Sequence, residues 1–168
     1  ENVDYHDISD NSFIIADNNI NQNFDNGWHL IGTPVILDSN LTIQSHINNG
    51  IGFGNGIDFW QIIDGDENVI DPISPSEQIF NSGDGYYFNL YSIVNEDFSK
   101  TLNLSGEVVT EYTIDNLNVG WNLISNPLVI SMNINNLNIL DGNGVPMSWE
   151  QANLEGLTSP YLLEFNSV

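Results

Sequence analysis

The sequence predicts an all-β protein built from two tandem β-sandwich-like units behind an N-terminal donor-type strand segment. Three observations predict it: short runs rich in β-branched and aromatic residues, clusters of Gly, Asn, Asp and Pro between these runs, and an internal repeat. Short strands with turn signals roughly every 8–12 residues are typical of sandwiches and barrels. The chain has 168 residues, of which 40% are hydrophobic, and this is enough apolar material for a folded core.

Strand and turn signals alternate along the whole chain. Strands are expected, among others, at residues 28–31, 59–63, 86–94, 101–104, 107–114 and 121–124. The sequence DGNG at residues 141–144 predicts a tight hairpin turn, because Gly and Asn adopt the positive φ of such turns at little cost. Helix signals are weak and limited to short stretches such as 43–47 and 148–154.

The repeat is clearest around two tryptophans. Residues 27–34 read GWHLIGTP and residues 120–127 read GWNLISNP, which gives an offset of 120 − 27 = 93 and five identities in eight positions. Self-similarity at a fixed offset marks repeated structural units. Because Trp28 and Trp121 recur in register, we expect each ring to fill the core of its unit; stacking on a sugar is the alternative.

The similarity extends upstream of both tryptophans, so that residues 1–26 are a copy of residues 95–119. The matched apolar pairs are Ile8 with Leu102, Ile20 with Ile114, and Phe24 with Leu117. The predicted organisation is therefore an N-terminal linking or donor strand segment at residues 1–26, a first repeat unit at 27–119 and a second, shorter unit at 120–168.

The charge of the chain excludes several partners. It carries 23 acidic residues against a single basic residue, Lys100, for a formal net charge of −22. Nucleic acid is excluded because nothing could neutralise its phosphates, and anionic membranes are disfavoured for the same reason. No run of about 18 apolar residues is present, so no membrane insertion is expected. Copies of the chain repel one another, so assembly must rely on backbone pairing, apolar burial or bound cations.

Catalytic patterns are absent from the sequence, and we expect no enzyme. The three histidines, His6, His29 and His46, are scattered, and Asn122 replaces His29 in the second copy of the motif. Cysteine is absent, and no nucleophile elbow, zinc-binding helix or phosphate-binding loop occurs.

The best candidate metal site is a calcium loop. Asp64, Asp66, Asn68 and Asp71 could present side-chain oxygens to a hard cation, and calcium is the one cofactor the sequence predicts. The stretch resembles the first half of an EF-hand loop, but Pro75 stands where the closing Glu belongs. A solvated turn is the alternative interpretation.

Contacts with sugars are expected in two forms. Trp60, Tyr86 and Tyr87 are candidates for stacking on carbohydrate, with ordinary strand packing as the alternative. Asn40 and Asn103 each begin an Asn-x-Ser/Thr sequon and are candidate glycosylation sites of an exported glycoprotein.

The GWNLISNP string at residues 120–127, together with the aromatic GYYF strand at 85–88, resembles the tandem β-repeat of many exported surface proteins of bacteria and some archaea. The resemblance implies β structure, an extracellular or cell-surface location, and a role in surface layers, adhesion or appendages. A first residue of Glu rather than Met fits a mature exported protein. The second unit departs from the pattern, because it has SPY at residues 159–161 where the aromatic strand should begin.

Two ways of closing a repeat unit remain open. Residues 1–94 and 95–168 could each be self-contained, or a unit could run from the Gly-Trp motif through the next linker copy. In the second case residues 1–26 of another molecule complete the second unit, and subunits join head to tail into a filament. The expected subunit interface then consists of Ile8, Phe13, Ile14, Ile15, Ile20 and Phe24. A self-contained, calcium-stabilised adhesin or carbohydrate-binding module is the alternative function.

Overall fold

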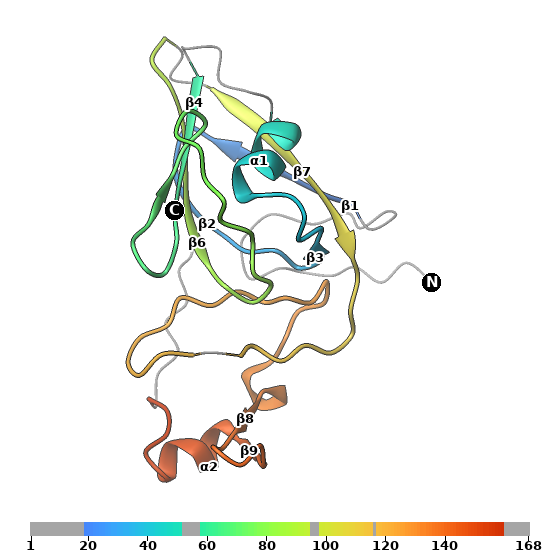
Figure 1. The fold of residues 1–168 in the computed structure, drawn as a ribbon. Helices are drawn as coiled ribbons and strands as arrows, with labels where there is room; N and C mark the ends of the chain where they lie inside the picture. Colours follow the sequence, from blue (N-terminus) through green and yellow to red (C-terminus); the bar gives the residue numbers. More distant parts are fainter. Residues whose placement is uncertain (1–18, 52–57, 95–97, 116, 160–168) are drawn as a thin grey trace.

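The computed structural model describes residues 19–51, 58–94, 98–115 and 117–159 (Figure 1). Its elements in chain order are β1 (Asn19–Asp25), β2 (Gly27–Ile31), β3 (Ile36–Leu37), α1 (Ile43–Ile51), β4 (Asp58–Ile63), β5 (Val69–Ile70), β6 (Tyr86–Ser92), β7 (Ser99–Glu107), a short 3-10 helix (Ile134–Asn136), β8 (Asn138–Leu140), β9 (Pro146–Ser148) and α2 (Trp149–Leu154). Most of the regular structure is antiparallel β-sheet with few helices, which confirms the predicted all-β class.

The first sheet has the order β1-β7-β3. Its long antiparallel ladder joins Asn19 to Ser105 at one end and Asp25 to Ser99 at the other. Along β1 the burial alternates, as expected for a strand with one face in the core, and Ile20 and Phe24 point inward. The prediction that Ile20 and Phe24 anchor in a neighbouring molecule is therefore wrong, because both side chains are buried in the core of their own chain.

The second sheet has the order β2-β6-β4-β5 and faces the first. Trp60 and Ile62 of β4 and Phe88 and Leu90 of β6 form its buried side. Phe24 of β1 meets Phe88 edge to face, with ring centroids 5.0 Å apart. This contact joins the two sheets into one hydrophobic core.

Helix α1 is longer than the short turn expected at residues 43–47. The Thr42 hydroxyl accepts the backbone N–H of Ser45, which satisfies one of the free donors of the first turn. Ile43, His46 and Ile47 are buried on its inner side, and the helix lies along β7 (Figure 1). A helix that covers the sheet in this way excludes water from the core.

The second copy of the Gly-Trp motif adopts a different structure from the first. Residues 121–124 form only an isolated bridge between Asp84 and Ile124, and residues 108–114 are irregular, so the strands expected at 121–124 and beyond residue 107 are wrong. The backbone N–H of Gly85 donates to Leu123 O at 3.0 Å, and that of Ser125 donates to Gly83 O at 2.7 Å. The second motif therefore pairs with the short loop that precedes β6.

The two repeated tryptophans lie at the surface. Trp28 is 52% exposed and Trp121 is 73% exposed. The prediction that they fill the cores of their units is wrong, because both side chains face solvent.

The hairpin turn predicted at residues 141–144 is confirmed and joins β8 to β9. Asp141 Oδ1 accepts the backbone N–H of Asn143 and that of Val145, both at 2.8 Å. Gly144 has a φ of 78°, which a residue without Cβ adopts readily. Helix α2 follows directly, with the Ser148 hydroxyl accepting the N–H of Gln151 at its start.

Four of the expected interface residues lie outside the described residues. They are Ile8, Phe13, Ile14 and Ile15.

Substitution of Gly106 by Ala is expected to destabilise the first sheet. A Cβ at Gly106 would collide with the backbone carbonyl of Ile36 and lie 2.8 Å from a methyl carbon of Val35. We expect a loss of about 1–3 kcal/mol in the free energy of unfolding, typical of an overpacked site. Denaturant unfolding of Gly106→Ala and of Gly65→Ala measures it; no atom lies within 4 Å of a Cβ at Gly65, so this control is expected to stay near wild type. Equal stability of the two variants would contradict the register of β3 on β7.

Candidate functional site

The predicted calcium ligands lie in and after the hairpin that joins β4 to β5. Asp64 Oδ1 accepts the backbone N–H of Asp66 at 3.0 Å and that of Asn68 at 2.8 Å. Asp64 Oδ2 accepts the side-chain amides of Asn68 at 2.9 Å and of Gln78 at 3.3 Å. Both oxygens of Asp64 thus receive hydrogen bonds that close the turn.

Asp71 has the same role in the next loop. Its Oδ1 accepts the backbone N–H of Ile73 at 2.8 Å and that of Ser74 at 2.6 Å, and its Oδ2 accepts the Ser74 hydroxyl at 3.1 Å. The backbone hydrogen bond from Ser74, with help from that of Ile73, lowers the pKa of Asp71 below its ordinary value of 3.8. Asp71 is therefore an ionised acceptor that holds the loop together.

These four residues do not form a ready-made cation cage. In the described part of the chain, no group of three or more His, Cys, Asp or Glu side chains is placed to hold a metal ion. The oxygens of Asp64 and Asp71 are directed at N–H and O–H donors of their own turns, which favours the solvated-turn interpretation of the sequence. Calcium binding stays a prediction.

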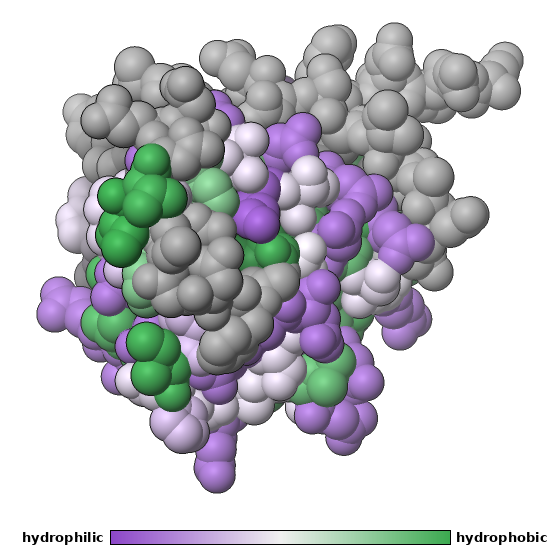
Figure 2. All heavy atoms as spheres, turned by 90° about the horizontal axis from the view of Figure 1, so that it is seen from above, coloured by the Kyte–Doolittle hydropathy of each residue, from purple (hydrophilic) through white to green (hydrophobic). Residues whose placement is uncertain are grey.

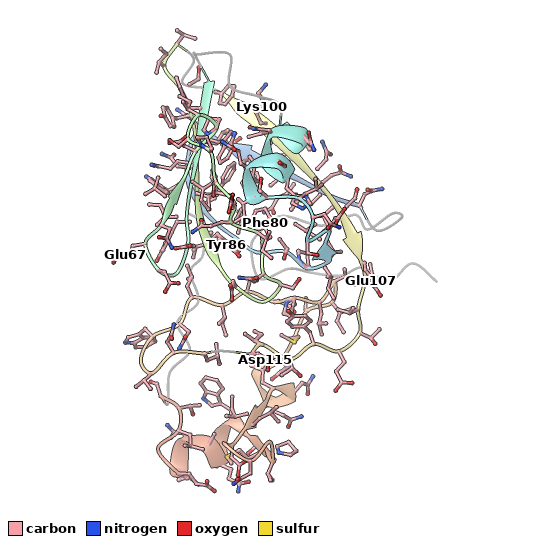
Figure 3. The ribbon with its side chains drawn as sticks, in the orientation of Figure 1. Glu67, Phe80, Tyr86, Lys100, Glu107 and Asp115 are labelled. Carbon is pink, nitrogen blue, oxygen red and sulfur yellow. The ribbon has the colours of Figure 1, made fainter. Side chains whose placement is uncertain are left out.

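Two of the three expected carbohydrate-stacking residues are buried. Trp60 is 2% exposed, and its indole N–H donates to Asn48 Oδ1 at 3.1 Å. Tyr86 is equally buried, packs edge to face on Phe80 (Figure 3) with centroids 5.0 Å apart, and accepts the N–H of Asn81 on its hydroxyl at 2.9 Å. Burial raises the pKa of Tyr86 to about 12. Stacking of sugars on Trp60 and Tyr86 is therefore corrected to core packing, the alternative noted from the sequence.

The third residue, Tyr87, is 39% exposed on the outer side of β6. It is accompanied there by Trp28 and Phe59, two aromatic residues that the sequence also offers for sugar stacking, and by Tyr91, which the sequence reasoning missed. The alternation of β2, β4 and β6 was the signal: every second residue of a strand points to the same face. Placing Phe59, rather than its neighbour Trp60, on the same sheet face as Trp28 locates this surface.

Both candidate glycosylation sites are exposed. The Asn40 side-chain amide donates to Asp38 Oδ1 at 2.7 Å, next to α1. The Asn103 amide donates to Gly50 O at 3.2 Å, from the outward side of β7. Attachment of glycans at Asn40 and Asn103 stays a prediction.

Apolar side chains reach the surface in separate patches, as the view in Figure 2 shows. One group follows β7 and extends into the second Gly-Trp motif, where Leu117 is 55% exposed and Val119 and Trp121 are also exposed. These residues follow Ile114, which packs against Gly83. No described strand pairs with residues 113–115 or 117–119.

Comparison with known proteins found no matching family model, no matching curated protein and no matching solved structure. Within the described ranges, none of the helices has the length and apolar character needed to span a bilayer. The function must therefore be inferred from the residues of this chain.

The contribution of Asp71 to stability is expected to depend on pH. Because its pKa is lowered in the folded state, its stabilising effect is present above the unfolded value of 3.8 and is lost as pH falls through the lower, folded value. We expect the melting temperature of wild type to exceed that of Asp71→Asn near neutral pH, and the gap to narrow below pH 3.8. Thermal melts at several pH values measure this gap, and Asp115→Asn, which removes an exposed carboxylate elsewhere, serves as the charge control. A gap independent of pH would show that the Asp71 carboxylate is not what holds the loop.

Proposed function

We propose that the chain is a structural subunit of an extracellular filament or surface appendage, in which a strand from a neighbouring copy completes the second repeat unit. The observation that carries this proposal is the ladder between β1 and β7, which extends from Asn19 paired with Ser105 to Asp25 paired with Ser99. The resemblance of the Gly-Trp repeat to exported surface proteins supports the location.

The ladder matters because of where its two strands lie in the repeat. β1 directly precedes the first Gly-Trp motif, whereas β7 lies in the segment that leads to the second one. Leu102 of β7 is the counterpart of Ile8, and it is buried against the first unit. The first unit is thus completed by β7, and the sequence of β7 has a copy near the N-terminal end of the chain, before β1.

The second unit has the counterpart of β1 but no described counterpart of β7. Ile114 and Leu117 correspond to Ile20 and Phe24, which are buried in the first unit. Leu117, by contrast, is more than half exposed, and residues 113–115 and 117–119 have no strand partner among the described residues. In the sequence, the other copy of β7 is residues 6–13, so we assign the completing strand to residues 6–13 of a second molecule.

Strand addition of this kind suits so acidic a chain. Backbone hydrogen bonds supply much of the affinity, and the alternate apolar side chains supply the specificity. Neither requires a basic patch, which a chain with 23 acidic residues and one basic residue cannot offer. The contact joins different surfaces of the two molecules, so it does not close on itself and generates a filament.

Substitution of Ile8 by Asp is expected to abolish assembly, because it would place a carboxylate where β7 has the buried Leu102. Ser9→Asp adds the same charge at the counterpart of Asn103, which is exposed on β7, and is expected to keep assembly. Negative-stain electron microscopy and analytical ultracentrifugation of the full chain measure the result.

The acceptor side is tested separately. Leu117→Asp is expected to block assembly while leaving the monomer folded, since Leu117 is already exposed. A peptide of residues 1–18 added in excess should cap the ends and shorten the filaments. A full chain that stays monomeric at all concentrations and does not bind this peptide would refute the proposal.

A further inference from the structure

The outer face of the β2-β6-β4-β5 sheet is aromatic and uncharged. The residues that point outward on its described strands are Trp28, Leu30, Phe59, Gln61, Ile63, Val69, Tyr87, Asn89 and Tyr91. None of them is acidic or basic, although the chain carries a net charge of −22. Trp28, Val69, Tyr87 and Tyr91 are exposed on this face, and the other five residues are partly buried. Single exposed apolar residues are ordinary on a protein surface, but several exposed on one uncharged sheet face point to an interaction site.

The rings on this face are held in a fixed arrangement by the strand register. Trp28 lies directly opposite Asn89, and Asn89 lies opposite Gln61, so one row across three strands consists of a tryptophan and two amides. Tyr87 and Tyr91 flank this row on β6, each diagonal to Trp28 and within reach of a large ring.

Tyr91 is further supported by its neighbour on β4. The rings of Tyr91 and Phe59 are stacked, with centroids 5.3 Å apart and planes inclined by 18°. Neither ring needs to lose much freedom on binding, because the sheet and the stack already restrict both. Such pre-organisation lowers the entropic cost of binding a ligand.

Aromatic faces and amide groups together suit one class of ligand. Tyr and Trp offer an apolar ring with a polar edge, which matches the C–H faces of pyranose rings, and side-chain amides both donate to and accept from hydroxyl groups. An anionic polymer would be repelled by the surrounding charge. We propose that this face, centred on Trp28, binds neutral polysaccharide chains.

This binding is independent of the proposed strand donation, since no residue of the face lies in residues 6–13 or 113–119. A surface protein with such a face would attach its filament or stalk to neutral glycans. The ligand would lie across the strands, over Trp28 and between Tyr87 and Tyr91.

The test is binding of the purified full chain to an array of neutral and acidic glycans, followed by titration of the best neutral oligosaccharide. We expect binding to neutral glycans, and Trp28→Ala is expected to weaken it at least about tenfold, as for a central aromatic contact. Trp28→Tyr, which keeps a ring, should retain most of the affinity.

Trp121→Ala is the matched control, because Trp121 is an exposed tryptophan from the same repeated motif that lies outside this face. Its affinity for the glycan is expected to equal that of wild type, and circular dichroism verifies that each variant is folded. Binding confined to acidic glycans, no glycan binding, or equal loss in the Trp28 and Trp121 variants would overturn the proposal. So would a Trp28→Ala variant that dissociates a dimer without changing glycan binding.

Discussion

The pairing of β1 with β7 is the interaction on which the rest of the structure depends. It places Phe24 against Phe88 and so brings the two sheets around one core. β3 and α1 both pack on β7, which means that they lose their support if the ladder opens. The two strands are far apart in the sequence, so their pairing closes a long loop whose entropic cost is repaid only when the whole core forms. The two sheets and α1 should therefore unfold cooperatively.

Strands β2, β4 and β6 and the hairpin at residues 141–144 could be predicted from alternation and turn chemistry, because each depends on a few neighbouring residues, whereas no strand is expected from the sequence at β1 or β5. Which residues of each strand point into the core could not be predicted in this way. In β4 the sequence DFWQII is apolar at adjacent positions, so either Phe59 or Trp60 could point inward, and a shift of one residue exchanges the two. The pairing with β6 decides it by burying Trp60. Trp28 is exposed for the same reason, since its position in β2 lies on the outer side.

The repeated motif shows how far tertiary context overrides local sequence. The first copy forms β2, paired along its whole length with β6, whereas the second copy pairs with the loop before β6 through a single bridge. Gly83 and Gly85 allow the second copy to pack against this loop, because a Cβ at either position would collide with side chains of the second half of the chain. The acidic loops are a second case in which the surrounding structure decides the role of a residue. Spacing predicts where carboxylates occur, but it does not show that the oxygens of Asp64 and Asp71 accept hydrogen bonds from backbone and side-chain donors of the neighbouring loops.

The chain carries a net charge of −22 and still has surfaces suited to contact, because its charges are unevenly distributed. Acidic side chains such as Asp64, Asp71 and Asp141 accept hydrogen bonds within turns, where they also stabilise the backbone. The open face of the second sheet and the exposed group at Leu117 and Val119 are formed by uncharged residues. Repulsion between exposed charges is screened beyond about 8 Å at physiological ionic strength, whereas strand pairing and ring stacking act at contact. Salt therefore removes the long-range barrier between two copies of the chain without weakening the contacts, so head-to-tail association should strengthen as ionic strength rises, whereas binding of a neutral glycan should change little.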